Sequence, residues 1–241
     1  MLISKDYKIF IAGHKGMVGS AIKRVLIKRG YSNLLCPSRK DLNLLDFQKV
    51  ENWFKENNPD IVILAAAKVG GIYANNSYTG DFILENLKIQ TNIIENAWKY
   101  KVKRFLFLGS SCIYPKLASQ PLKEEYLLTG ALENTNESYA IAKIAGIKLC
   151  AALKIQYGFD AISLMPTNLY GPGDNYHIRD SHVMAALLRR FYEAKEDSSS
   201  VTCWGSGKAL REFMHVDDLA NAVSYLMEVW DPDAIDAPKD E

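Results

Sequence analysis

The chain has 241 residues, 48% of them hydrophobic and 24% charged, with a formal net charge of +1 at pH 7. This is ordinary globular composition, and because the basic and acidic residues are interspersed we expect no nucleic-acid partner. No apolar run reaches the ~18–20 residues that span a bilayer, so we expect no membrane partner.

Short apolar runs alternate with helix-length segments over the first two thirds of the chain. This alternation predicts an α/β fold with a Rossmann-type doubly wound parallel sheet. We expect strands at 8–12, 34–37, 61–65, 104–108 and 160–165. We expect helices at 17–28, 47–56, 81–100 and 138–157.

The alternation weakens after Gly171-Pro172-Gly173. A helix at 181–194 and a strand at 201–204 are predicted there, in a separate small lobe. An amphipathic helix at 216–229 follows, and the acidic end at 230–241 shows no packing pattern and is expected to fray.

The predicted domain division follows from this change of pattern. Residues 1–171 are expected to form the nucleotide-binding Rossmann domain, with 211–230 packing back onto it. Residues 172–210 are expected to form the substrate lobe.

A glycine trio, Gly13-x-x-Gly16-x-x-Gly19, lies between the first predicted strand and its helix. Glycines in this context permit a tight turn and a close approach of the backbone to a pyrophosphate at the helix N-terminus. The spacing is a variant of the usual Gly-x-Gly-x-x-Gly. We predict dinucleotide binding here.

Basic residues after the second strand indicate which nicotinamide cofactor binds. Arg39 and Lys40 stand where a carboxylate would select NAD, and Lys15 lies within the glycine loop. Asp41 follows them and weakens the prediction slightly. NADP is favoured, and the alternative is that Arg39 and Lys40 are solvated loop charges.

Tyr139 and Lys143 are four residues apart on a predicted helix and therefore share one face. A free phenol titrates near pH ~10, and a nearby ammonium favours the phenolate. We expect Lys143 to tune Tyr139 for proton transfer to a ketone during hydride transfer. Ser110, at the carboxyl end of the fourth strand, is placed to hydrogen-bond the same carbonyl.

Cys112 follows Ser110 closely and could move a proton beside that carbonyl, although a buried, inert cysteine is the commoner case. His182 is a candidate acid or a structural residue. Arg190 and Arg211 are candidate diphosphate ligands or ordinary surface arginines. The four cysteines lack metal-ligand spacing, so we expect no metal and a reduced, cytoplasmic setting.

Several longer strings make the chain resemble a known family, and the resemblance covers about residues 8–227. The chain resembles extended short-chain dehydrogenase/reductases that act on nucleotide sugars, and among them the bifunctional epimerase/reductases. The strings are Gly13-His14-Lys15-Gly16-Met17-Val18-Gly19-Ser20-Ala21-Ile22, Ala65-Ala66-Ala67-Lys68-Val69-Gly70-Gly71-Ile72, Leu108-Gly109-Ser110-Ser111-Cys112-Ile113-Tyr114-Pro115-Lys116, Met165-Pro166-Thr167-Asn168-Leu169-Tyr170-Gly171-Pro172 and Arg211-Glu212-Phe213-Met214-His215-Val216-Asp217-Asp218.

The resemblance implies a reaction and roles for particular residues. It implies 3,5-epimerisation and then 4-reduction of GDP-4-keto-6-deoxy-D-mannose with NADPH. Ser110, Tyr139 and Lys143 would form the reductase triad, and Cys112 and His182 the epimerisation base and acid. A homodimer built on the helices at 81–100 and 138–157 is also implied.

Ligand-binding residues are implied in the same way. The cofactor would contact Gly13, Lys15, Gly16, Met17, Val18, Gly19, Arg39, Asp41, Leu42, Tyr139, Lys143, Pro166, Asn168, Leu169 and His182. The GDP moiety would contact Arg190, Trp204 and Arg211.

Two departures from the family pattern leave alternatives open. Ser138 stands where relatives often have proline, and relatives continue several tens of residues further, so we expect an incomplete substrate lobe. A truncated, weakly active or non-catalytic NADP-binding homologue is one alternative. A nucleotide-sugar epimerase that releases no reduced product is another, which Cys112 and His182 argue against.

Overall fold

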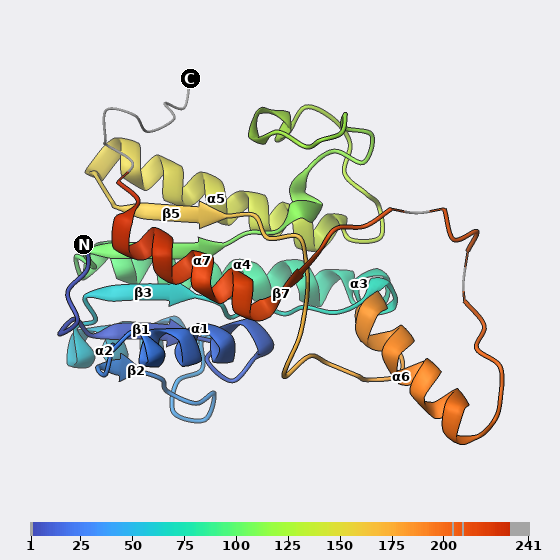
Figure 1. The fold of residues 1–241 in the computed structure, drawn as a ribbon. Coiled ribbons are helices and arrows are strands. Elements are labelled where there is room, and N and C mark those ends of the chain that lie inside the picture. Colours follow the sequence, from blue (N-terminus) through green and yellow to red (C-terminus); the bar gives the residue numbers. More distant parts are fainter. Residues whose placement is uncertain (1, 204, 209, 232–241) are drawn as a thin grey trace.

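The computed structural model describes residues 2–203, 205–208 and 210–231. Its centre is a five-stranded parallel sheet in the order β2-β1-β3-β4-β5 (Figure 1). The strands are β1 (Ile9–Ala12), β2 (Leu34–Leu35), β3 (Ile61–Leu64), β4 (Arg104–Leu108) and β5 (Ala161–Leu164). The order reverses beside β1, so the sheet is doubly wound and the predicted fold class is confirmed.

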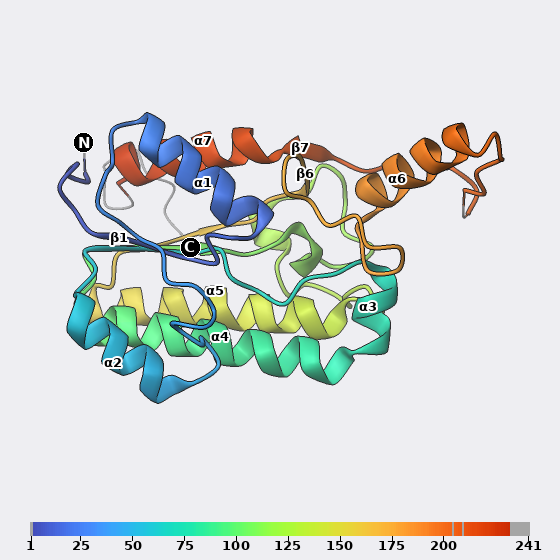
Figure 2. The same cartoon turned by 90° about the horizontal axis from the view of Figure 1, so that it is seen from below.

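Two layers of helices cover the sheet, as Figure 2 shows. On one face lie α1 (Met17–Lys28) and α7 (Val216–Val229). On the other lie α2 (Phe47–Asn57), α4 (Thr79–Lys99) and α5 (Glu137–Tyr157). Because successive strand residues point to opposite faces, Ile9 and Ile11 pack in the first layer and Phe10 in the second.

The strands and helices expected in the first 165 residues are present, with ends that differ by a few residues. Three short helices were not predicted. They are α3 (Ile72–Ser77) and two single 3₁₀ turns, Ser111–Ile113 and Glu124–Tyr126. No helix among the described residues is long and apolar enough to cross a membrane.

A second, two-stranded parallel sheet pairs β6 (Asn168–Tyr170) with β7 (Phe213–His215). The side chains of Thr167 and Asn168 both donate to Glu212 O, over 3.0 Å in each case, at the start of this pairing. Two motifs more than forty residues apart are thereby joined beside the main sheet.

The segment between β6 and β7 carries α6 (Val183–Glu196), which projects beyond the carboxyl ends of the strands (Figure 1). The helix expected at 181–194 is therefore present. The strand expected at 201–204 is not formed at 201–203, and Trp204 lies outside the described residues. Residues 201–203 pair with no other described strand, and β propensity by itself does not form a ladder.

The end predicted to fray, 230–241, begins with Trp230, and for that residue the prediction is wrong. Its ring packs against the core on the α1/α7 face. The buried Arg104 donates to Trp230 O over 2.8 Å and to Met227 O over 3.2 Å, and pairs with Asp160. A guanidinium thus caps the C-terminus of α7, where the helix dipole favours positive charge. Residues 232–241 lie outside the described part of the chain.

Candidate active site

In the loop between β1 and α1, two of the three glycines stand where a side chain would not fit. Gly13 has φ +89°, and a Cβ there would lie 2.7 Å from Ala66 N on β3's following loop. A Cβ on Gly19 would overlap with the Gly13 carbonyl oxygen. These two glycines let α1 start directly against the ends of β1 and β3.

Gly16 is different, because a Cβ there would meet nothing closer than Gly13 O at 3.5 Å. It is the exposed N-cap residue of α1, and the first turn of that helix holds no acidic side chain. Open space in front of free N–H groups at a helix N-terminus fits a pyrophosphate. The residues present therefore fit a dinucleotide.

The predicted selectivity residues lie at the rim of this loop. Lys15, Arg39 and Asp41 are exposed. Hydrogen bonds from Ser38 lower the pKa of the Asp41 carboxyl, and the Lys15 charge contributes. Asp41 is thus held by Ser38 and lies within electrostatic reach of Lys15.

The remaining cofactor-binding residues predicted by resemblance fall into two groups. Met17 and Val18 open α1, and Leu42 is buried beneath the loop after β2. Pro166, Asn168 and Leu169 lie between β5 and the end of β6, and Pro166 O accepts from Ser111 N over 3.0 Å. The second group therefore adjoins the residues that follow β4.

Ser110 and Cys112 lie at the carboxyl end of β4, in and before a single 3₁₀ turn. The Ser110 hydroxyl accepts a hydrogen bond from Cys112 N at 3.4 Å. Burial raises the pKa of the Cys112 thiol, while a hydrogen bond with Ser110 and the charge of Lys143 act in the opposite direction. The thiol is protonated at neutral pH, beside a cation that favours its ionisation.

Tyr139 and Lys143 occupy successive turns of α5 and face the end of β4. Lys143 is 4% exposed, and its Nζ donates to Leu108 O over 2.7 Å and lies 5.6 Å from the Tyr139 ring centre. Burial lowers the pKa of Lys143 from 10.5 to about 8, opposed by Cys112. Its ammonium is therefore easily deprotonated for a lysine.

The expected tuning of Tyr139 by Lys143 is not what the structure shows. Burial, with a smaller contribution from Cys112, raises the pKa of the Tyr139 phenol. The physical reason is that burial removes the water that would stabilise the phenolate, and Lys143 directs its Nζ to a main-chain carbonyl. Four predicted catalytic residues nevertheless gather at one place: Ser110, Cys112, Tyr139 and Lys143.

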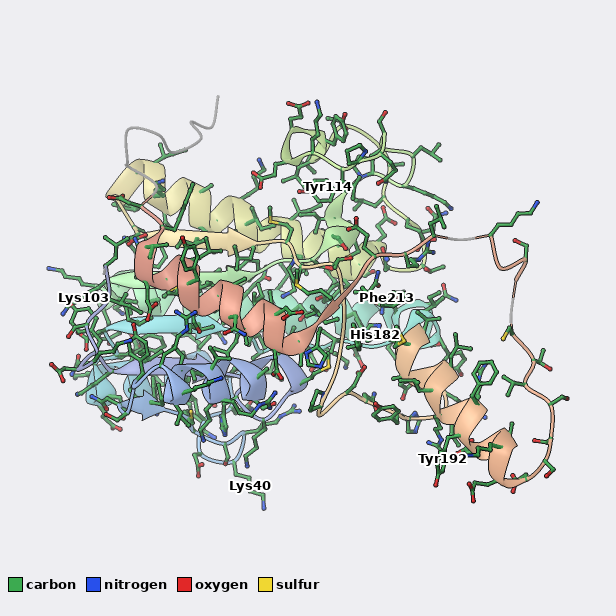
Figure 3. The ribbon with its side chains drawn as sticks, in the orientation of Figure 1. Lys40, Lys103, Tyr114, His182, Tyr192 and Phe213 are labelled. Carbon is green, nitrogen blue, oxygen red and sulfur yellow. The ribbon has the colours of Figure 1, made fainter. Side chains whose placement is uncertain are left out.

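His182 belongs to the segment between β6 and β7, where it is the N-cap residue of α6. Figure 3 shows it at the base of that helix, with Tyr192 toward the outer end. The residue is exposed, but the protein atoms around its ring lower the pKa by desolvation. The negative charge of Asp174 acts in the opposite direction. The position of His182 is therefore set by the segment that leads into α6.

Two of the predicted GDP-binding residues are described. Arg190 lines a cavity of about 350 Å³ at the outer end of α6, together with Glu193, Asp197 and neighbouring residues. Arg211 is exposed and donates to Leu210 O over 2.8 Å. Trp204 lies outside the described residues, so the structure places only the two arginines.

Sequence reasoning missed the residues that support this site. Phe82 of α4 packs edge-on against Tyr139 with ring centres 6.5 Å apart. Gln90, also on α4, donates to Ala142 O over 2.6 Å in the turn that carries Lys143. A polar residue every fourth or fifth position on an otherwise apolar helix face, Asn86 and Gln90, was the available signal.

Comparison with known proteins shows which family has this arrangement. The model of the NAD dependent epimerase/dehydratase family matches residues 9–237. GDP-L-fucose synthase 1 of Arabidopsis thaliana is 59% identical to this chain, over 93% of this chain and 70% of its own length. GDP-L-fucose synthase of Escherichia coli (strain K12) is 58% identical over 92% of this chain and 70% of its own.

A solved structure agrees with this comparison. A GDP-mannoheptose C4 reductase from Campylobacter jejuni, solved with NADP bound, superimposes with a TM-score of 0.87 at 44% identity. The match covers 94% of this chain and 74% of that one.

Proposed function

The chain belongs to the GDP-L-fucose synthases of the NAD dependent epimerase/dehydratase family, and we propose that it converts GDP-4-keto-6-deoxy-D-mannose to GDP-L-fucose by 3,5-epimerisation and 4-reduction. The observation that carries the proposal is the gathering of Ser110, Cys112, Tyr139 and Lys143 at the end of β4. A phenol, a thiol and an ammonium at one place suit both proton transfer and ketone reduction.

NADP is the proposed cofactor, and when bound NADPH supplies the hydride for carbon 4. The glycine loop and the N-terminus of α1 hold its pyrophosphate, and Gly16 has no side chain that would fill that space. Lys15 and Arg39 hold its 2′-phosphate, since exposed cations at the loop rim suit a second phosphate. The structure of the GDP-mannoheptose C4 reductase with NADP bound supports this choice.

Epimerisation is assigned to Cys112 and His182. A 4-keto group acidifies carbons 3 and 5, so the Cys112 thiolate takes a proton from each carbon in turn. His182, protonated, gives a proton to the opposite face, which inverts that carbon. Solvent then takes the proton from Cys112 and reprotonates His182, so that the same pair can act on the other carbon. Ser110 and Tyr139 hydrogen-bond the developing enolate oxygen.

In the reduction step, Tyr139 donates its phenolic proton to the oxygen on carbon 4. Lys143 stabilises the phenolate that remains, and its pKa of about 8 lets it relay a proton between Tyr139 and solvent near neutral pH. Ser110 holds the carbonyl oxygen in place. One pocket thereby serves both steps.

The substrate lobe and the assembly complete the proposal. Residues 1–171 with 211–230 form the cofactor domain, and 172–210 form the substrate lobe, where Arg190, Arg211 and Trp204 bind the GDP moiety. A homodimer uses the outer faces of α4 and α5. Exposed apolar side chains support this: Leu84, Ile141, Ile155 and Tyr157. The proposed setting is the cytoplasm, where the cysteines stay reduced.

The test is the stoichiometry of a complete turnover with authentic keto-sugar. The proposal predicts one NADPH oxidised per GDP-L-fucose formed, with both inverted centres in the product. Product without NADPH consumption would indicate an epimerase alone. NADPH binding without any product would indicate a non-catalytic member of the family.

A further inference from the structure

The loop at 66–71, between β3 and α3, is fastened to α4 on one side by a buried amide. Asn86 is 2% exposed. Its Oδ1 accepts from Lys68 N over 2.9 Å, and its Nδ2 donates to Lys68 O over 3.0 Å. Both main-chain groups of one loop residue are thus paired with one side chain, which fixes that residue in position and orientation.

The side chain of Lys68 adds a second attachment to the same helix. Its Nζ lies 2.6 Å from a Glu85 oxygen and 3.1 Å from an Asp81 oxygen. It also lies 5.9 Å from the ring centre of Phe82, the residue that packs against Tyr139. The loop is therefore held in place against the part of α4 that packs on the Tyr139 phenol.

On its other side the loop holds the chain that leads into His182. Gly71 N donates to Asp180 O over 2.9 Å, and a Cβ on Gly71 would overlap with Ser181 O. The Asn75 side chain, 8% exposed, donates to Gly70 O and Gly71 O over 2.7 and 3.1 Å. Backbone thus meets backbone with no room for a side chain between.

We propose that the loop at 66–71 is the positioning element that sets the distance of His182 from Tyr139 and Cys112, with Gly71 as its positioning residue. The chain of contacts runs from α4 through the loop to Asp180 and Ser181, the two residues directly before His182. This inference rests on the proposed function only for the role of His182 as proton donor.

The direct test is Gly71→Ala, with Gly80→Ala as the matched control. Gly71 has φ −67°, so alanine suits the backbone and only the overlap with Ser181 O forces movement. A Cβ on Gly80, in the first turn of α4, meets nothing within 4 Å. Both changes add one methyl group, and only one of them displaces the segment before His182.

Two readouts separate positioning from general destabilisation. The first is deuterium uptake at carbons 3 and 5 in heavy water, measured against the Kd for NADPH. For Gly71→Ala we expect uptake to fall at least ~10-fold, because misplacement of a catalytic group by about 1 Å costs up to ~10²-fold. The Kd should stay within ~2-fold, and Gly80→Ala should change neither quantity by more than that.

The second readout needs no substrate. The ring resonances of His182, assigned with His182→Gln, should move in Gly71→Ala, while those of His14 and His215 stay in place. Unmoved His182 resonances, or unchanged uptake in a folded Gly71→Ala protein, would overturn the inference. A wild-type protein without uptake, but with a His182 signal that moves in Gly71→Ala, would refute the proposed function and leave the positioning role standing.

A second pair of variants covers the case in which Gly71→Ala does not fold. Lys68→Met removes the ion pairs to Glu85 and Asp81, and Lys99→Met removes a comparable pair with Glu51 at the far end of α4. Lys68→Met should move the His182 resonances and lower uptake several-fold, and Lys68→Arg should restore both. Equal effects of Lys68→Met and Lys99→Met would overturn the inference.

Discussion

Replacing Lys143 with methionine should stabilise the folded chain while abolishing reduction. The ammonium is 4% exposed, and burial lowers its pKa from 10.5 to about 8. A lysine with a lower pKa in the folded than in the unfolded chain opposes folding as long as it is charged in both. The cost is fully present below pH 8 and is relieved as the pH rises from 8 toward 10.5.

The size of the effect follows from these values. At about 1.36 kcal/mol per pKa unit, the difference between 10.5 and about 8 corresponds to about 3 kcal/mol at neutral pH. The variant loses the hydrogen bond from Lys143 to Leu108 O, worth about 1 kcal/mol. We therefore expect the free energy of unfolding at pH 7 to rise by about 2 kcal/mol.

Urea unfolding at pH 7.0 and 9.5 tests both the sign and the pH dependence. Between these pH values the wild type should regain about 2 kcal/mol relative to the variant, so that the difference approaches zero at pH 9.5. Lys148→Met, an exposed position on α5, is the control and should change stability by less than about 0.5 kcal/mol. A Lys143→Met protein that is less stable at pH 7, or a difference independent of pH, would refute the reasoning.

Two further predictions concern the glycine loop and the epimerisation pair. Gly16→Ala should keep the thermal midpoint but weaken NADPH binding at least ~10-fold, because its Cβ enters the space proposed for the pyrophosphate. Gly19→Ala should lower the thermal midpoint and also lose NADPH binding, because its Cβ overlaps with Gly13 O. This loss should occur despite a helix-propensity gain of about 1 kcal/mol. Equal melting curves for the two variants would contradict the steric argument. Burial raises the pKa of the Cys112 thiol and lowers the pKa of the His182 ring, so the thiolate–imidazolium form should stay a small and constant fraction between the two pKa values. The kcat/KM for deuterium exchange should therefore be flat from about pH 6.5 to 9, and a narrow optimum inside that range would contradict the assignment.

Local sequence patterns were sufficient for the sheet and for the residues at its carboxyl edge. Unbroken apolar runs such as 61–64 identify buried parallel strands, and Gly13, Gly16 and Gly19 mark the turn between strand and helix. Ser110 and Tyr139 could be placed because each lies at a fixed offset from such an element. These features depend on residues near one another in the chain.

Long-range contacts could not be predicted in this way. The three-residue strands β6 and β7 are too short to carry a periodic signal, and each exists only because the other lies beside it. The spacing of Tyr139 and Lys143 put them on one helix face but could not show that Lys143 reaches Leu108 O. The role of Gly71 likewise depends on Ser181, a residue over a hundred positions away.

The shared pocket is tested most directly by Cys112→Ser in heavy water with authentic keto-sugar and NADPH. We predict that deuterium uptake at carbons 3 and 5 is lost while NADPH-dependent reduction of the ketone continues, because Ser110, Tyr139 and Lys143 are intact. Undiminished uptake in the Cys112→Ser protein would contradict the assignment of Cys112 and, with it, the proposal that one pocket performs both steps.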